Sequence, residues 1–136
     1  MNTDKEEKME TLQLYSIAEK ENIDVVDYAF DNTINGVYIE NLKCIGLDRS
    51  LNDTERKCTI AEELGHYYCN ATYPLSCTDT TLINKAEYRA KKWAVKALVS
   101  PSDLQKIKQQ GLRYKWEIAE FLNITEDVAE RIGICG

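Results

Sequence analysis

Apolar residues recur along this chain with two different periods. Leu12, Tyr15, Ile17 and Ala18 follow a roughly helical spacing, which predicts a helix over about residues 7–22. Three short runs rich in β-branched residues follow and predict strands; they cover residues 23–26, 36–39 and 44–47. Because the runs are short and close in sequence, we expect them to form a small, mainly antiparallel sheet.

The second half of the chain has the pattern of helices. Asn52 stands three residues before Glu55, which is the spacing of a capping box, and predicts a helix that carries residues 58–69. Residues 70–80 lack periodicity and are expected to form a loop. Helical spacing and cap residues then predict a long helix and three shorter ones, over residues 81–99, 102–111, 115–122 and 125–132.

These elements describe an α+β protein with two long central helices. A chain of 136 residues is long enough for one hydrophobic core and too short for two full domains. Hydrophobic residues make up 43% and charged residues 29%, as in ordinary globular proteins. We expect a core over residues 1–101 and a C-terminal helical segment over 102–136 that belongs to the same compact unit.

The charge balance excludes some classes of function. The net charge of -6 disfavours direct nucleic-acid binding, because phosphate contacts require clustered lysine and arginine. No run approaches the roughly 18 apolar residues of a membrane span. The first ten residues are charged where a signal peptide would have an apolar region, so we expect no membrane association and a cytoplasmic location.

One stretch carries candidate catalytic chemistry, namely Glu62-Glu63-Leu64-Gly65-His66. In the zincin motif, two histidines four residues apart on one helix face bind a metal ion, and the glutamate after the first activates water. His66, the only histidine of the chain, stands in the second ligand position, and Glu62 stands in the first. Glu63 is then the candidate general base, and the glycine inside the helix indicates that something approaches the backbone there.

A third metal ligand is expected on the next long helix. Glu87 lies 21 residues after His66, where a glutamate-type zincin would provide its third ligand. Carboxylates are acceptable ligands for zinc, but a second negative ligand weakens the acidity of the metal toward its bound water. A set of Glu62, His66 and Glu87 is rich in oxygen, so manganese or iron could replace zinc.

Four segments in order resemble the ImmA/IrrE family of zincin-like metallo-endopeptidases. The active helix of that family reads His-Glu-Leu-Gly-His, and residues 59–68 match it except at Glu62. Residues 45–52 resemble the edge strand and the loop into that helix, and residues 87–101 resemble the ligand-bearing helix, with Arg89 where the family often has its glutamate. Residues 116–132 resemble the C-terminal helical segment.

The resemblance implies a function for the chain. Family members of bacteriophages and mobile elements act as anti-repressors that cleave or inactivate a helix-turn-helix transcriptional repressor, and an acidic protein suits such a basic partner. The leading hypothesis is therefore a zinc-dependent endopeptidase with a variant motif, although whether the chain is an enzyme stays open. The alternative is a catalytically impaired zincin-fold protein that binds a repressor without cleaving it.

Other residues have competing interpretations. Residues 115–132 have the length of a helix-turn-helix, but their excess of glutamate and aspartate opposes contact with DNA phosphates. Tyr67, Tyr68 and Tyr73 are candidates for stabilising an oxyanion. Lys91, Lys92 and Lys96 are interpreted as a solvated helix face. The sequence leaves the substrate, the metal and the oligomeric state undetermined.

Overall fold

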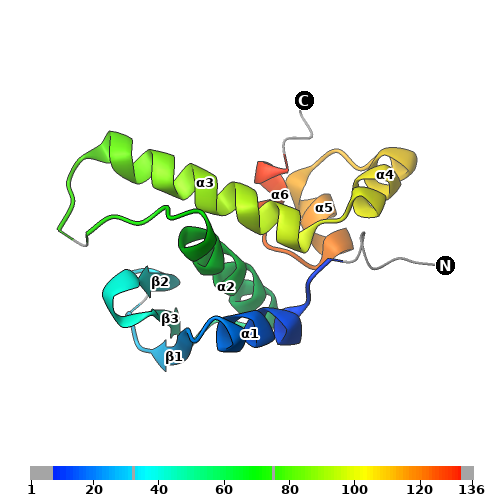
Figure 1. Ribbon diagram of the computed structural model, residues 1–136. Helices are drawn as coiled ribbons and strands as arrows, with labels where there is room; N and C mark the ends of the chain where they lie inside the picture. The colour runs from blue at the N-terminus through cyan, green and yellow to red at the C-terminus, as the bar shows by residue number, and fades with distance from the viewer. Residues whose placement is uncertain (1–7, 32, 75, 133–136) are drawn as a thin grey trace.

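A computed structural model describes residues 8–31, 33–74 and 76–132 (Figure 1). The described residues form an α+β fold of helices and one small sheet, which confirms the expected class. The elements in chain order are α1 (Thr11–Lys20), β1 (Asp24–Tyr28), β2 (Gly36–Ile39), the 3-10 turn η2 (Glu40–Leu42), β3 (Cys44–Asp48), α2 (Asp53–Tyr68), α3 (Thr80–Leu98), α4 (Pro101–Gln110), α5 (Lys115–Leu122) and α6 (Glu126–Arg131).

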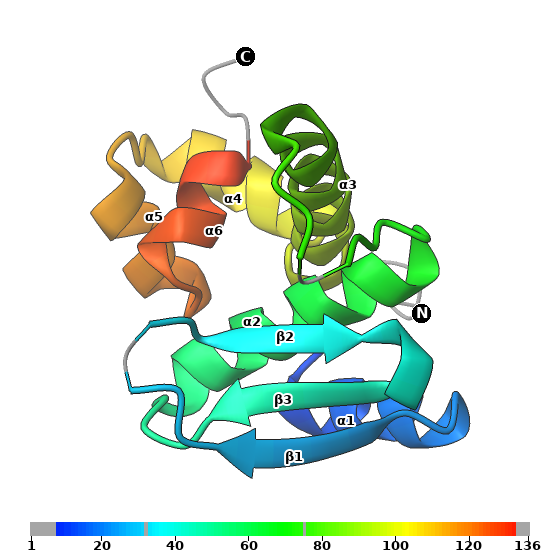
Figure 2. The same ribbon diagram turned by 90° about the vertical axis from the view of Figure 1, so that its left-hand side faces the viewer.

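The sheet is mixed, and the expectation of a mainly antiparallel sheet is wrong. Its strand order is β1-β3-β2, with β1 parallel to β3 from Asp24↔Cys44 onward and β2 antiparallel to β3 from Gly36↔Leu47 onward. Taken in chain order, the three strands alternate in direction, so β1 and β3 run the same way. The β2–β3 hairpin places β3 between the other two strands in the sheet (Figure 2). Two strands that run the same way therefore become neighbours, while β1 and β2 form the edges.

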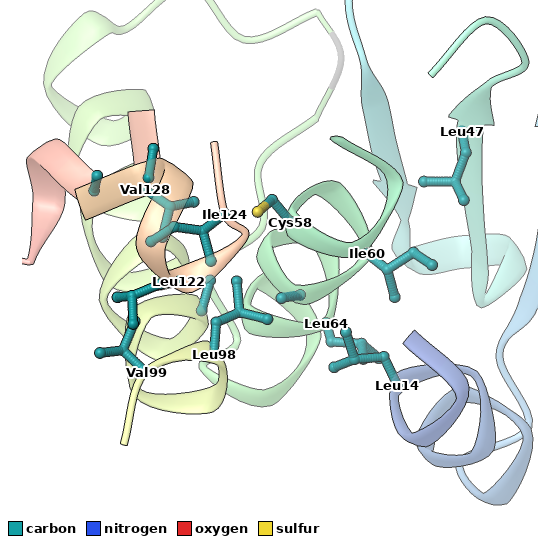
Figure 3. Packing of buried hydrophobic residues seen from close by; sticks show 14 of the residues in the cluster. Leu14, Leu47, Cys58, Ile60, Leu64, Leu98, Val99, Leu122, Ile124 and Val128 are labelled. Atoms are coloured by element: carbon teal, nitrogen blue, oxygen red, sulfur yellow. The ribbon is translucent and has the colours of Figure 1, made fainter. Parts of the chain in front are cut away.

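Helix α2 lies at the centre of the fold. Its N-terminus has the expected capping box, in which Asn52 Oδ1 accepts a hydrogen bond from the Glu55 amide and Glu55 Oε1 accepts one from the Asn52 amide. Figure 3 shows Ile60 and Leu64 of α2 near Leu14 of α1. Cys58 of the same helix faces the C-terminal helices. Helix α2 therefore packs against other elements on two opposite sides.

The C-terminal helices pack against α3 and share one core with the sheet and α1. Leu98, Leu122 and Val128 belong to the same buried cluster as Leu14 and Leu47 (Figure 3). Helix α1 is shorter than the expected 7–22: it starts after Glu10, whose amide donates to Gln13, and residue 7 lies outside the described residues.

The turns that follow α4 and α5 begin with residues in the left-handed backbone conformation. Asn123 joins α5 to α6 with φ of 57°, a left-handed conformation that asparagine tolerates better than most residues. Gly111 ends α4 with φ of 68°. Over the described ranges, none of the helices combines the length and the apolar content required to cross a membrane.

Candidate metal centre

Three side chains of α2 bring their ligand atoms together. One ligand atom each from Glu62, Glu63 and His66 lies within 4.8 Å of the other two. Residues 62 and 66 share a helix face because four residues make about one turn. The structure therefore places the candidate ligands Glu62 and His66 and the candidate base Glu63 in one cluster.

The Glu63 carboxyl group is buried between α2 and the sheet, and its residue is only 7% exposed. The pKa of Glu63 is raised to about 8, mainly by burial and also by the nearby carboxylates of Glu62 and Glu87, whereas the charge of His66 opposes the shift. Without a bound cation, a carboxyl group with such a pKa is mostly protonated at neutral pH, and the positive charge of a cation beside it would favour the carboxylate. That property suits a group that accepts a proton and later returns it.

His66 is oriented by the loop after α2. Its Nδ1–H donates to the Ala71 carbonyl oxygen, which leaves Nε2 directed at Glu87 Oε2, 3.2 Å away. Burial alone lowers the pKa of His66, but the hydrogen bond to Glu87 and the charge of Glu63 outweigh it and raise the pKa to about 9. A carbonyl that fixes one ring nitrogen while the other faces the site is the usual arrangement around a metal-binding histidine.

Glu87 of α3 joins this cluster from the opposite side. Its hydrogen bond to His66 lowers its pKa to about 2, and the Tyr73 hydroxyl donates to the same carboxylate oxygen at 2.8 Å. Tyr67 and Tyr68 instead donate to Glu21, away from the cluster. Of the three tyrosines considered from the sequence, Tyr73 is the one in contact with the candidate site.

Lys91 is the residue that the sequence interpretation missed. Its side chain is 19% exposed, and its Nζ lies 3.2 Å from Glu62 Oε2 and 3.4 Å from Asp127 Oδ2. Burial lowers the pKa of Lys91, but the two carboxylates more than compensate and raise it. The interpretation of Lys91 as part of a solvated face is wrong, since α6 covers it, whereas Lys92 and Lys96 are exposed.

Gly65 allows the two long helices to approach each other closely. A Cβ atom at this position would overlap the carbonyl oxygen of Ala90 in α3. The expectation that something approaches the backbone at this glycine is confirmed, and the approaching group is the partner helix. Glu87 lies three residues before Ala90 and Lys91 directly after it, so the contact positions both side chains, one helical turn apart, against the cluster on α2.

The residues present are chemically suited to a divalent cation. Three carboxyl groups, those of Glu62, Glu63 and Glu87, surround one imidazole. Loss of hydration on burial is the main cause that raises the pKa of Glu62 and of Glu63, and the negative charge of Glu87 raises both further. A divalent cation would compensate the negative charge of these carboxylates. One nitrogen with several oxygens is a ligand set that zinc, manganese or iron accepts. Lys91 competes for Glu62, so it opposes ligation by that residue.

Comparison with known proteins decides the family. Residues 16–132 match the family profile of the IrrE N-terminal-like domain. The chain belongs to the IrrE N-terminal-like domain family. This is a family of metal-dependent peptidase-type regulators, as the sequence resemblance indicated. No curated protein matches the sequence.

Among solved structures, the IrrE-like chain is similar to a Mycobacterium tuberculosis transcriptional regulator. The TM-score is 0.60 at 15% identity, over 89% of this chain and 40% of that chain. Such low identity supports the shared fold alone. The chain spans less than half the length of that regulator, so the activity of a whole regulator does not transfer to it directly.

Proposed function

We propose that this chain is a metal-dependent endopeptidase of the ImmA/IrrE type that cleaves or inactivates a helix-turn-helix repressor. The observation that carries the proposal is the convergence of Glu62, Glu63 and His66 on α2 with Glu87 on α3. Zinc is the leading metal, with manganese or iron as alternatives, because the ligand set is rich in oxygen.

A groove along the edge strand β2 supports a peptide substrate. Gly36 and Glu63 line both a cavity of about 510 Å³ and a neighbouring one of about 80 Å³. Tyr38 and Tyr73 line the small cavity and a third one of about 560 Å³. β2 pairs with β3 on one side among the described strands, so its other edge can bind an extended chain through main-chain hydrogen bonds.

Each residue of the cluster has a defined task in peptide hydrolysis. A bound divalent cation would supply Lewis-acid polarisation of the scissile carbonyl and of the attacking water. His66, Glu87 and, once released from Lys91, Glu62 would hold that cation. Glu63 takes a proton from the attacking water and delivers it to the leaving amine. The Tyr73 hydroxyl donates to Glu87 and orients that carboxylate for ligation.

The part of the groove beside Glu62 is acidic. Glu55, Glu62, Glu63 and Asp127 line the 510 Å³ cavity, together with the single cation of Lys91. Negative potential favours a substrate segment that carries lysine or arginine. Repressors use such residues to contact DNA phosphates, so the charge of the groove supports a repressor as the substrate.

One observation favours the alternative, a catalytically impaired protein that acts by binding. In the structure Lys91 forms an ion pair with Glu62, so a residue in a ligand position already has a cationic partner. Under this alternative the groove still binds the repressor segment, and hydrolysis is absent. Mutation of Glu63 then has no effect on repression.

The deciding experiment is incubation of the purified chain with helix-turn-helix repressors of its own source genome, with added zinc or manganese. We expect one defined cleavage, which Glu63→Gln abolishes and the surface control Glu19→Gln retains. Elemental mass spectrometry should find about one equivalent of metal, and His66→Ala should lose it. Tight repressor binding without cleavage, also in Glu62→His, would overturn the endopeptidase assignment in favour of the alternative.

A further inference from the structure

A groove between α3 and α6 gathers positive charge on an acidic protein. Lys91, Lys92, Lys96 and Arg131 line a cavity of about 340 Å³. None of the described residues that line it is acidic, although the chain has a net charge of -6. The concentration of four cations in one concave surface is therefore a local feature, not a consequence of composition.

Three of these four cations form no salt bridge within the described part of the chain. Among the described residues, Lys92, Lys96 and Arg131 form no salt bridge, whereas Lys91 pairs with Glu62 and Asp127. Arg131 and Lys91 are close enough to repel each other electrostatically. Like charges held together by the packing of two helices are stabilised when an anion binds between them.

The remaining lining is apolar and aromatic. Val95 and Ile132 provide aliphatic surface, and the exposed ring of Tyr88 stands at the α3 side. The cavity volume is at the lower end of the range for small-molecule sites. A flat apolar group beside Tyr88 with a phosphate among the ammonium groups matches both parts of the lining.

We propose that the groove lined by Lys92, Lys96 and Arg131 binds a small phosphorylated ligand, and that the ligand competes with Glu62 for Lys91. The lysine ammonium groups attract phosphate as point charges on flexible side chains, and the guanidinium of Arg131 can donate two parallel hydrogen bonds to phosphate oxygens. The surface of α6 beside the groove carries Glu126 and Glu130, which disfavours a long nucleic acid that would extend past it.

Lys91 connects this groove to the candidate metal centre. It lines both the basic groove and the 510 Å³ cavity that contains Glu62 and Glu63. A phosphate that attracts the Lys91 ammonium weakens the ion pair with Glu62 and leaves that carboxylate free to bind a cation. This link rests on the proposed metal-dependent function, whereas binding of the phosphorylated ligand does not.

Calorimetric titration of the metal-free chain at constant ionic strength tests the binding step. The probes are AMP and inorganic pyrophosphate, with adenosine and a short DNA duplex for comparison. We expect AMP to bind, adenosine not to bind, and Lys92→Ala/Lys96→Ala to weaken AMP at least about tenfold, as expected when charge-assisted hydrogen bonds are lost.

The double variant Lys106→Ala/Lys108→Ala on α4 is the matched control. It removes the same charge from exposed positions away from the groove and should change AMP affinity less than about twofold. Three outcomes would overturn the site: no binding of AMP or pyrophosphate by the wild type, equal weakening in both double variants, or binding of the DNA duplex as tight as that of AMP.

Carbon-13 NMR of the glutamate carboxyl groups tests the link to Glu62 without metal or activity. The Glu62 resonance, assigned with Glu62→Gln, should move when AMP binds to the wild type and stay fixed in Lys91→Met. Saturation with AMP and an unmoved Glu62 resonance would overturn the link. Because repressor cleavage is not measured here, this result is separate from the fate of the proposed function.

Discussion

Lys91 Nζ lies 3.2 Å from Glu62 Oε2, so the carboxylate in the first ligand position of the motif is paired with an ammonium group of α3. The two side chains are 19% and 21% exposed, which leaves the pair partly shielded from water. An ion pair of this kind holds Glu62 in place and also opposes its use by a metal ion. The two residues therefore have to be considered together.

Replacing Lys91 should strengthen metal binding. Lys91→Met retains most of the side-chain volume and removes the charge that competes for Glu62. We expect the affinity for manganese or zinc to rise about five- to tenfold, which corresponds to roughly 1 kcal/mol for a partly shielded pair. Calorimetric metal titration measures the change. The neighbouring exposed Lys92→Met is the control, and an equal gain in both variants would contradict a specific role of the Lys91–Glu62 pair.

Tyr73 should matter for turnover more than the other tyrosines near the C-terminus of α2. Its hydroxyl donates to Glu87 at 2.8 Å, whereas that of Tyr68 donates to the remote Glu21 at 3.0 Å. We expect Tyr73→Phe to reduce kcat for repressor cleavage about 10- to 100-fold, as when other side chains that orient a metal ligand are removed. Tyr68→Phe should remain near wild type. If both variants cleave equally well, Tyr73 has no part in the reaction.

Gly65→Ala should destabilise the fold although alanine favours helices. The added Cβ would overlap the Ala90 carbonyl oxygen, so α2 and α3 must separate. We expect a loss of about 1–3 kcal/mol in the free energy of unfolding, measured by urea denaturation. Gly111→Ala is the comparison: nothing lies within 4 Å of its added Cβ, and its cost is that of a left-handed residue alone, about 1 kcal/mol. A Gly65→Ala protein as stable as wild type would contradict the close helix contact.

The stability of the chain should depend on pH through Asp48 at the end of β3. Its carboxylate accepts hydrogen bonds from the Ser50 hydroxyl and from the Phe30 amide, and these lower its pKa below the ordinary 3.8. A lowered folded-state pKa contributes stability above the unfolded value of about 4, and this contribution is lost as pH falls through the folded value. Chemical denaturation between pH 2 and pH 6 should show the loss.

In Asp48→Asn this part of the pH dependence should be absent, and stability at neutral pH should be lower than in wild type. Asp24→Asn, an exposed residue at the start of β1, is the control and should retain the wild-type slope. An unchanged slope in Asp48→Asn would show that the contacts to Ser50 and Phe30 do not stabilise the charged form.

Several elements were predictable because their signals are local. The capping box of Asn52 and Glu55 and the cluster of Glu62, Glu63 and His66 on α2 depend on residues within a few turns of one another. Glu87, singled out by its spacing on the next helix, lies beside His66 in the structure. The sheet was less predictable, because strand order depends on how a hairpin inserts against an earlier strand, and no local pattern specifies that.

The sequence by itself determined the α+β class, the helix that carries the variant motif, the family resemblance and the identity of the candidate ligands. The tertiary structure alone decided that Lys91 pairs with Glu62, that Tyr73 contacts Glu87 while Tyr67 and Tyr68 do not, and that a basic groove forms between α3 and α6. The physical reason is the distance along the chain over which each interaction acts. Helical periodicity and capping act between neighbours in sequence, whereas a charged side chain acquires its partner from whichever element packs against it.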